Sequence, residues 1–60
     1  MRLVKKDKHG TVLAFTPEEL ATLANALNEA LEGIEEWEFP TRMGTTRADV
    51  EALRAALSLV

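Results

Sequence analysis

The spacing of apolar residues along this 60-residue chain begins with a strand pattern. Two short β-prone stretches, residues 2–6 and 11–15, flank the tetrapeptide "DKHG" at residues 7–10. Asp and Gly at the ends of this tetrapeptide suit a type I turn closed by a left-handed glycine. The pattern predicts a β-hairpin over about residues 2–15.

The segment "FTPEEL", residues 15–20, predicts the start of a helix. Thr16 suits the N-cap, Pro17 suits the first helical position, and Glu19 completes a capping box. The apolar residues that follow repeat at helical spacing: Leu20, Leu23, Ala24, Leu27, Leu31 and Ile34. We expect a helix over about residues 17–33, ended by Gly33 as a left-handed cap.

The segment that follows, "EEWEFPTRMGT", predicts an irregular loop over about residues 34–45. Pro40 disfavours helical backbone at Phe39, and Gly44 interrupts whatever precedes it. We expect Trp37 and Phe39 to close the open end of the core. Arg42 is expected to fasten the loop to a carboxylate or a carbonyl.

A second helix is predicted over about residues 46–59, with Thr46 as its cap and Asp49 three residues later. Its expected inner stripe consists of Val50, Leu53, Leu57 and Val60. A second apolar face, nearly opposite, consists of Ala48, Ala52, Ala55 and Leu59. A helix that is apolar on two sides needs a neighbour on each side.

These elements predict an α+β fold in the order ββαα, a single small domain whose helices pack on one face of the hairpin. A chain of this length buries a thin core, and it has no cysteine with which to add a disulfide. We therefore expect a homodimer. The edges of the hairpin and the face of Ala48, Ala52, Ala55 and Leu59 are both candidate interfaces, and the helix face is favoured because it has no other evident use.

The net charge of −3 conceals an uneven distribution of charge. Residues 1–10 are basic, whereas residues 11–38 contain seven glutamates and no basic residue. One interpretation is a solvated helix face. The other is a contact surface for a protein partner, formed by Glu29, Glu32, Glu35, Glu36, Trp37 and Glu38.

The sequence offers little for catalysis. It has no cysteine nucleophile and no Gly-rich phosphate loop, and His9 falls in the predicted hairpin turn. We expect no enzymatic activity, no cofactor and no metal. No apolar run reaches the roughly 20 residues that span a bilayer, and residues 1–10 lack a secretory signal. A cytoplasmic protein is the resulting expectation.

Residues 16–53, "TPEELATLANALNEALEGI…EFPTRMGTTRADVEAL", resemble a family of small bacterial proteins of unknown function. The matching parts are "NALNEALEGI" and an "FxTRMGTTR"-like pattern. The resemblance covers most of the chain and implies a shared fold. It carries no activity and no functional residue to this sequence.

Two classes of function remain. The first is a non-catalytic protein-interaction module, such as an immunity-type inhibitor or accessory subunit, that binds a basic partner. The second is a nucleic-acid-binding regulator that uses the basic hairpin and the helix after Gly44, a segment similar to a helix-turn-helix. We favour the first, because Pro40 lies where the preceding helix is needed and because Asp49 and Glu51 repel phosphate.

Overall fold

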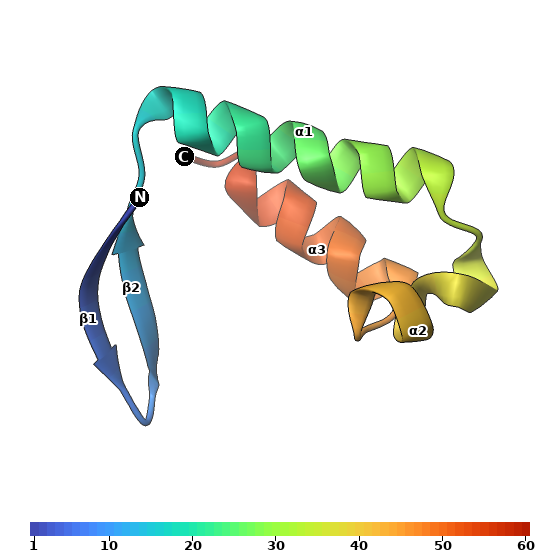
Figure 1. Ribbon diagram of the computed structural model, residues 1–60, viewed down its shortest axis with the longest axis horizontal. Helices are drawn as coiled ribbons and strands as arrows, with labels where there is room; N and C mark the ends of the chain where they lie inside the picture. Colours follow the sequence, from blue (N-terminus) through green and yellow to red (C-terminus); the bar gives the residue numbers. More distant parts are fainter.

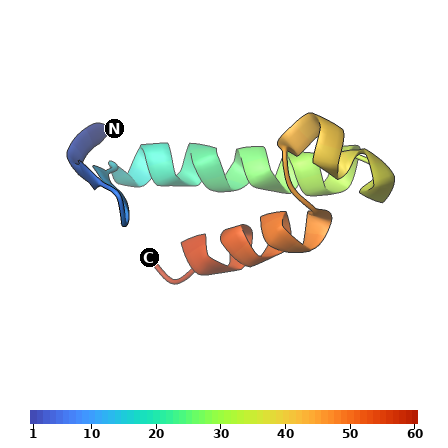
Figure 2. The same ribbon diagram turned by 90° about the horizontal axis from the view of Figure 1, so that it is seen from below.

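The computed structural model describes residues 1–60 and contains a hairpin followed by helices. In chain order the elements are β1 (Arg2–Asp7), β2 (Gly10–Ala14), α1 (Pro17–Gly33), the 3-10 helix η1 (Glu36–Glu38), α2 (Phe39–Met43) and α3 (Arg47–Leu57). The helices α1 and α3 lie side by side, with η1 and α2 at one end and the hairpin at the other (Figures 1 and 2). This confirms the α+β class and the order of hairpin and helices. None of the helices combines the length and the apolar character needed to cross a bilayer.

The hairpin forms where the sequence predicts it. β1 and β2 pair antiparallel, with Leu3 opposite Leu13 and Lys6 opposite Thr11, and the register shifts by one residue at Val4. The backbone N–H of His9 donates to Oδ1 of Asp7 at 2.8 Å, which fixes the turn. Gly10 has φ 158°, so it is nearly extended and does not adopt the predicted left-handed helical conformation.

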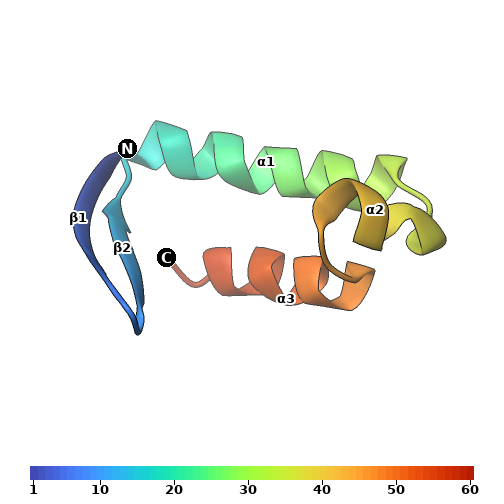
Figure 3. The ribbon, with the colours of Figure 1, turned by 60° about the horizontal axis from the view of Figure 1, so that its bottom comes forward.

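The hairpin stands off the end of α1, and the prediction that the helices pack on one face of it is wrong (Figures 1 and 3). Every residue of β1 is exposed, and β2 is exposed up to Ala14. Only Phe15 and Thr16 join β2 to α1, and Thr16 is the extended N-cap of the helix. We call this projecting element, residues 2–14, the hairpin arm.

The capping box at the start of α1 is present as predicted. The hydroxyl of Thr16 accepts from the backbone N–H of Glu19 at 3.1 Å, and a carboxylate oxygen of Glu19 accepts from the N–H of Thr16 at 2.9 Å. Pro17 lies in the first turn, where its missing N–H leaves no hydrogen bond unmade. Two otherwise unpaired donors at the helix start are thereby satisfied.

The end of α1 differs from the prediction. Gly33 is the last helical residue, without a positive φ, and the cap is the extended Ile34, whose N–H donates to the carbonyl of Ala30 at 3.0 Å. The extended backbone turns Ile34 toward the core, where it packs against the buried cluster. Packing of Ile34 takes the place of the left-handed glycine cap.

The core is small and is centred on Phe39. Phe39 is completely buried, while Leu27 of α1 and Val50 of α3 are 7% and 3% exposed. Leu31, Ile34 and Leu57 are partly buried against these three. One aromatic ring therefore fills the space where α1, α2 and α3 meet, and it is the only completely buried side chain.

A short helix replaces the loop expected before Gly44. Phe39 has φ −55° and ψ −46°, and Pro40 lies in the first turn of α2. Pro40 does not exclude helix here, because burial of Phe39 fixes the backbone and a proline is tolerated at a helix start. Gly44, with φ 75°, ends α2 in the left-handed conformation, as its position predicts. Arg42 donates to Oε2 of Glu38 at 2.6 Å, the predicted kind of fastening.

The cap of α3 is confirmed, but its inner face is not the predicted stripe. The hydroxyl of Thr46 accepts from the N–H of Asp49 at 3.2 Å. Val50 and Leu57 face the core, whereas Leu53 and Val60 are more than half exposed. Arg47 and Arg54 are partly buried and bond to α1, which turns the inner face away from Leu53.

The contact between the Thr16 hydroxyl and the N–H of Glu19 should contribute to the stability of the fold. Replacing Thr16 by Ala removes the acceptor for the N–H of Glu19 and should destabilise the protein by about 0.5–2 kcal/mol in urea denaturation. Thr22→Ala is the matched control, since the Thr22 hydroxyl donates to the Glu18 carbonyl within the helix and caps nothing. If both variants unfold at the denaturant midpoint of the parent chain, the cap contributes nothing measurable.

The hydrogen bonds of Asp49 should make the stability of the protein depend on pH in the acid range. Hydrogen bonds from the hydroxyl of Thr45 and then from Thr46 lower the pKa of Asp49 below its usual value. A folded-state pKa below the unfolded one contributes stability above the unfolded value, and this contribution is lost as pH falls through the folded value. Thermal melts should therefore show stability decreasing below about pH 4. Asp49→Asn should flatten that slope; an identical slope in the variant would assign the acid sensitivity to other carboxylates.

Candidate protein-interaction surfaces

Trp37 lies on the outside of the molecule, in η1. Its side chain is 79% exposed, although Phe39, two residues later, is completely buried. Successive residues of a helical turn are about 100–120° apart, so residues two apart point to opposite sides. The expectation that both aromatics close the core is correct for Phe39 and wrong for Trp37. The larger aromatic is left in solvent.

The predicted acidic residues surround Trp37 in sequence and are largely free of internal partners. Glu29, Glu32, Glu35 and Glu36 are exposed and form no salt bridge, and only Glu38 is paired, with Arg42. We call Trp37 together with Glu29, Glu32, Glu35, Glu36 and Glu38 the acidic surface. Its exposed aromatic side chain and four unpaired carboxylates give it the chemistry of a contact for a cationic partner.

The electrostatics of the C-terminal end of α1 strengthen this character. The last turn of α1 contains no basic residue, although the partial negative charge of a helix C-terminus favours cations. Glu29 and Glu32 therefore lie where negative side chains are least favourable. Positive charge brought to this end from outside relieves an unfavourable interaction and adds an attractive one.

Arg47 provides one such charge from within the chain. Its Nη1 donates to the carbonyl of Leu31 at 2.6 Å, its guanidinium lies 5.7 Å from the centroid of the Phe39 ring, and its Nε is 2.8 Å from Glu51. Contact with a helix-end carbonyl and an aromatic face holds α3 on α1. The sequence gives no signal for this role, because Leu31 and Arg47 are separated by 16 residues.

Arg54 is also held inside the molecule. Its Nε donates to Oδ1 of Asn28 at 2.9 Å, between α3 and α1. Asn28 thus orients an arginine of the neighbouring helix. With Arg42 on Glu38, all three arginines after residue 38 make internal contacts.

The arrangement of α2, Gly44 and α3 bears on the helix-turn-helix alternative. A helix does precede the turn, so the argument that Pro40 prevents one is wrong. That helix has only five residues, and the arginines of α3 bond to α1. Arg47 and Arg54, the cations of α3 that could contact phosphate, are therefore already hydrogen-bonded within the molecule.

The hairpin arm carries the free positive charge of the chain. Lys5 pairs with Asp7 at 3.5 Å, whereas Arg2, Lys6 and Lys8 form no salt bridge. His9 is exposed in the turn, as predicted. The apolar residues of the arm, Leu3, Val4, Val12 and Leu13, lie near its root and are 38–57% exposed. The arm is thus apolar near its base and, apart from Arg2, carries its basic residues toward the tip.

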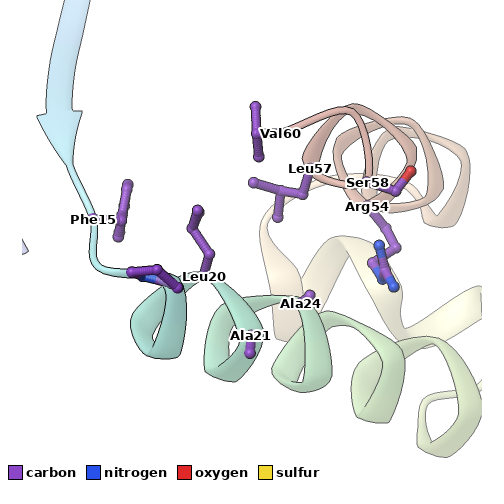
Figure 4. A pocket seen from close by; sticks show the side chains of 9 residues that line it. Phe15, Leu20, Ala21, Ala24, Arg54, Leu57, Ser58 and Val60 are labelled. Atoms are coloured by element: carbon purple, nitrogen blue, oxygen red, sulfur yellow. The ribbon is translucent and has the colours of Figure 1, made fainter.

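An apolar groove of about 450 Å³ lies between the root of the arm, the first turns of α1 and the end of α3. Its apolar walls include Phe15 and Leu20 on one side and Leu57 and Val60 on the other, with Arg54 and Ser58 among the polar residues (Figure 4). We call this feature the apolar groove. The sequence gives no signal for this groove, because its walls come from residues about 40 positions apart.

The predicted interface residues of α3 are on the surface. Ala48, Ala52, Ala55 and Leu59 are all exposed, and Leu59 is 87% exposed. Three of these four side chains are single methyl groups, so the face offers little apolar area besides Leu59. No group of three or more His, Cys, Asp or Glu side chains is arranged to hold a metal ion.

Comparisons with models of protein families, with curated proteins and with solved structures found no match for this chain. The resemblance of residues 16–53 to small bacterial proteins therefore stays a prediction.

Proposed function

We propose that this chain is a small non-catalytic protein-interaction module, of the kind represented by immunity-type inhibitors and accessory subunits, which binds a basic protein partner. The observation that carries the proposal is the 79% exposure of Trp37, in a segment of the sequence that also holds four exposed carboxylates without internal partners. A buried tryptophan is a frequent hot spot of protein interfaces, and charged residues around it steer and orient the partner.

The energetics of the acidic surface support a cationic partner in particular. Exposed carboxylates at a helix C-terminus oppose the helix dipole, so an approaching lysine or arginine interacts favourably with both. Individual surface ion pairs contribute about 0–1 kcal/mol, which is too little to bind a partner alone. Desolvation of Trp37 supplies the main favourable term, and the glutamates determine which partners can approach.

We also propose that the chain forms a homodimer, on the basis of its large exposed surface. The accessible surface is 4818 Å² for a mass of 6.6 kDa. Folded monomers of this mass expose about 3,900 Å², so this chain exposes a surplus of about 900 Å². A standard interface buries about 800 Å² on each partner. Association of two copies brings the exposed surface to the value typical of a folded monomer.

The nucleic-acid alternative has weaker support. Its remaining cations are those of the hairpin arm, because Arg47 and Arg54 bond to α1. We expect no measurable binding of a 20-base-pair DNA duplex at about 150 mM salt in a fluorescence anisotropy titration. Micromolar binding that weakens steeply with salt and is lost in Lys6→Glu with Lys8→Glu would instead establish the alternative.

Trp37 provides the direct test of protein binding. Trp37→Ala should weaken binding to a basic partner about 30-fold or more, the equivalent of a hot spot worth about 2 kcal/mol. A polylysine peptide and purified basic nucleases are suitable probes in isothermal titration calorimetry. Helical circular dichroism should be unchanged, because the side chain lies outside the core.

Leu53→Ala is the matched control, since Leu53 is an exposed apolar residue away from the acidic surface. Its affinity for the same probes should equal that of the parent chain. Equal losses in both variants would contradict the proposed function, and so would a parent chain that neither binds a basic probe nor self-associates.

A further inference from the structure

We propose that the acidic surface binds the basic hairpin arm of a second copy of this chain, with Trp37 of each protomer seated in the apolar groove of the other. This inference rests on the proposed function and identifies the partner. In the dimer, the acidic surface of one protomer lies against the hairpin arm of its partner. A two-fold axis repeats the contact, so each protomer donates one tryptophan and accepts one.

The two halves of this contact lie at opposite ends of the molecule. Trp37 follows the C-terminal end of α1, whereas the groove is formed at its N-terminal end (Figures 1 and 4). A helix of 17 residues is about 25 Å long, so Trp37 does not reach the groove of its own chain. An antiparallel second copy places each end beside the complementary end of its partner.

The charges of the two ends are opposite. The hairpin arm carries three cations without a salt bridge, Arg2, Lys6 and Lys8, and the acidic surface carries four unpaired carboxylates. Both sets are exposed, and each belongs to the end of the molecule that also carries an apolar element, the groove at one end and Trp37 at the other. Complementary rims around an apolar centre are the usual arrangement of a specific interface.

The groove suits an aromatic anchor. Its volume of about 450 Å³ lies within the range of pockets that enclose a side chain or small ligand. Phe15 and Leu57 are only partly buried and Val60 is 83% exposed, so its walls still present apolar surface to solvent. Seating Trp37 there covers the most exposed aromatic residue and the largest apolar hollow together.

The surplus of exposed surface on each chain agrees with the area that a two-fold contact buries. The surplus of about 900 Å² per chain, relative to a folded monomer of this mass, is close to the roughly 800 Å² that a standard interface buries on each partner. The alanine face of α3 is the competing interface. It offers little apolar area besides Leu59, because its other three side chains are single methyl groups.

Trp37 reports on its own burial, because the chain contains one tryptophan and no tyrosine. As the protein concentration rises through the dissociation constant measured by sedimentation equilibrium, the emission maximum of Trp37 should shift to shorter wavelength. Trp37→Phe keeps an aromatic anchor and should weaken the dimer less than Trp37→Ala, which should raise the dissociation constant about 30-fold or more.

Charge reversal tests the pairing of the two ends. Lys6→Glu with Lys8→Glu, and separately Glu35→Lys with Glu36→Lys, should each raise the homodimer dissociation constant about tenfold or more, because like charges then meet. Mixed in equal amounts, the two variants should form a heterodimer as tight as the parent dimer, since both of its contacts are again complementary. All four positions are exposed, so circular dichroism should show unchanged folding. Ala52→Glu is the control and should leave the dimer intact.

A parent chain that sediments as a monomer up to high micromolar concentration would overturn the inference. The inference would also be wrong if Ala52→Glu with Ala55→Glu dissociated the dimer whereas Trp37→Ala and the charge reversals left it intact. That result would assign the interface to α3. A monomeric chain whose Trp37 emission shifts on addition of a basic nuclease would retain the proposed function and exclude only the second copy as partner. Failure of the two proposals is therefore distinguishable.

Discussion

Burial of the Phe39 ring is the interaction on which the folded structure depends. It is the one completely buried side chain, and it lies where Leu27 of α1 and Val50 of α3 converge. Arg47 lies over the ring and donates to the end of α1, so the same residue is held by apolar packing and by a cation above its face. Without this ring, α1 and α3 share a few aliphatic contacts and the two arginine hydrogen bonds to Leu31 and Asn28.

So small a core has consequences for the surface. A chain of this length cannot enclose all of its apolar residues, and the hairpin arm, Trp37 and the apolar groove are the parts left outside. They are not scattered, because basic charge accompanies the arm and groove, whereas acidic charge accompanies Trp37. The separation of charge that is visible along the sequence becomes a separation between two ends of the molecule.

The elements defined by neighbouring residues could be predicted well. Thr16, Pro17 and Glu19 determine where α1 begins, and Thr46 determines where α3 begins. Prediction failed where a distant partner decides the outcome. Pro40 disfavours helix locally, yet burial of Phe39 makes that segment helical, and Leu53 has the right spacing for the core but is displaced by two arginines that bond to α1.

The sequence by itself determined the position of the hairpin turn, both helix N-caps, the break at Gly44 and the uneven charge, because each depends on residues close together in the chain. Tertiary structure decided which of two neighbouring aromatics is buried, where the arginines bond, that the hairpin projects as an arm, and that a groove forms at its root. These features depend on contacts between segments far apart in the chain, where the same side chain can pack, pair or face solvent according to its neighbours. The acidic surface depends on both sequence and tertiary structure. Its composition can be read from the sequence, and the exposure of Trp37 follows from the turn that places Phe39 inside and Trp37 outside.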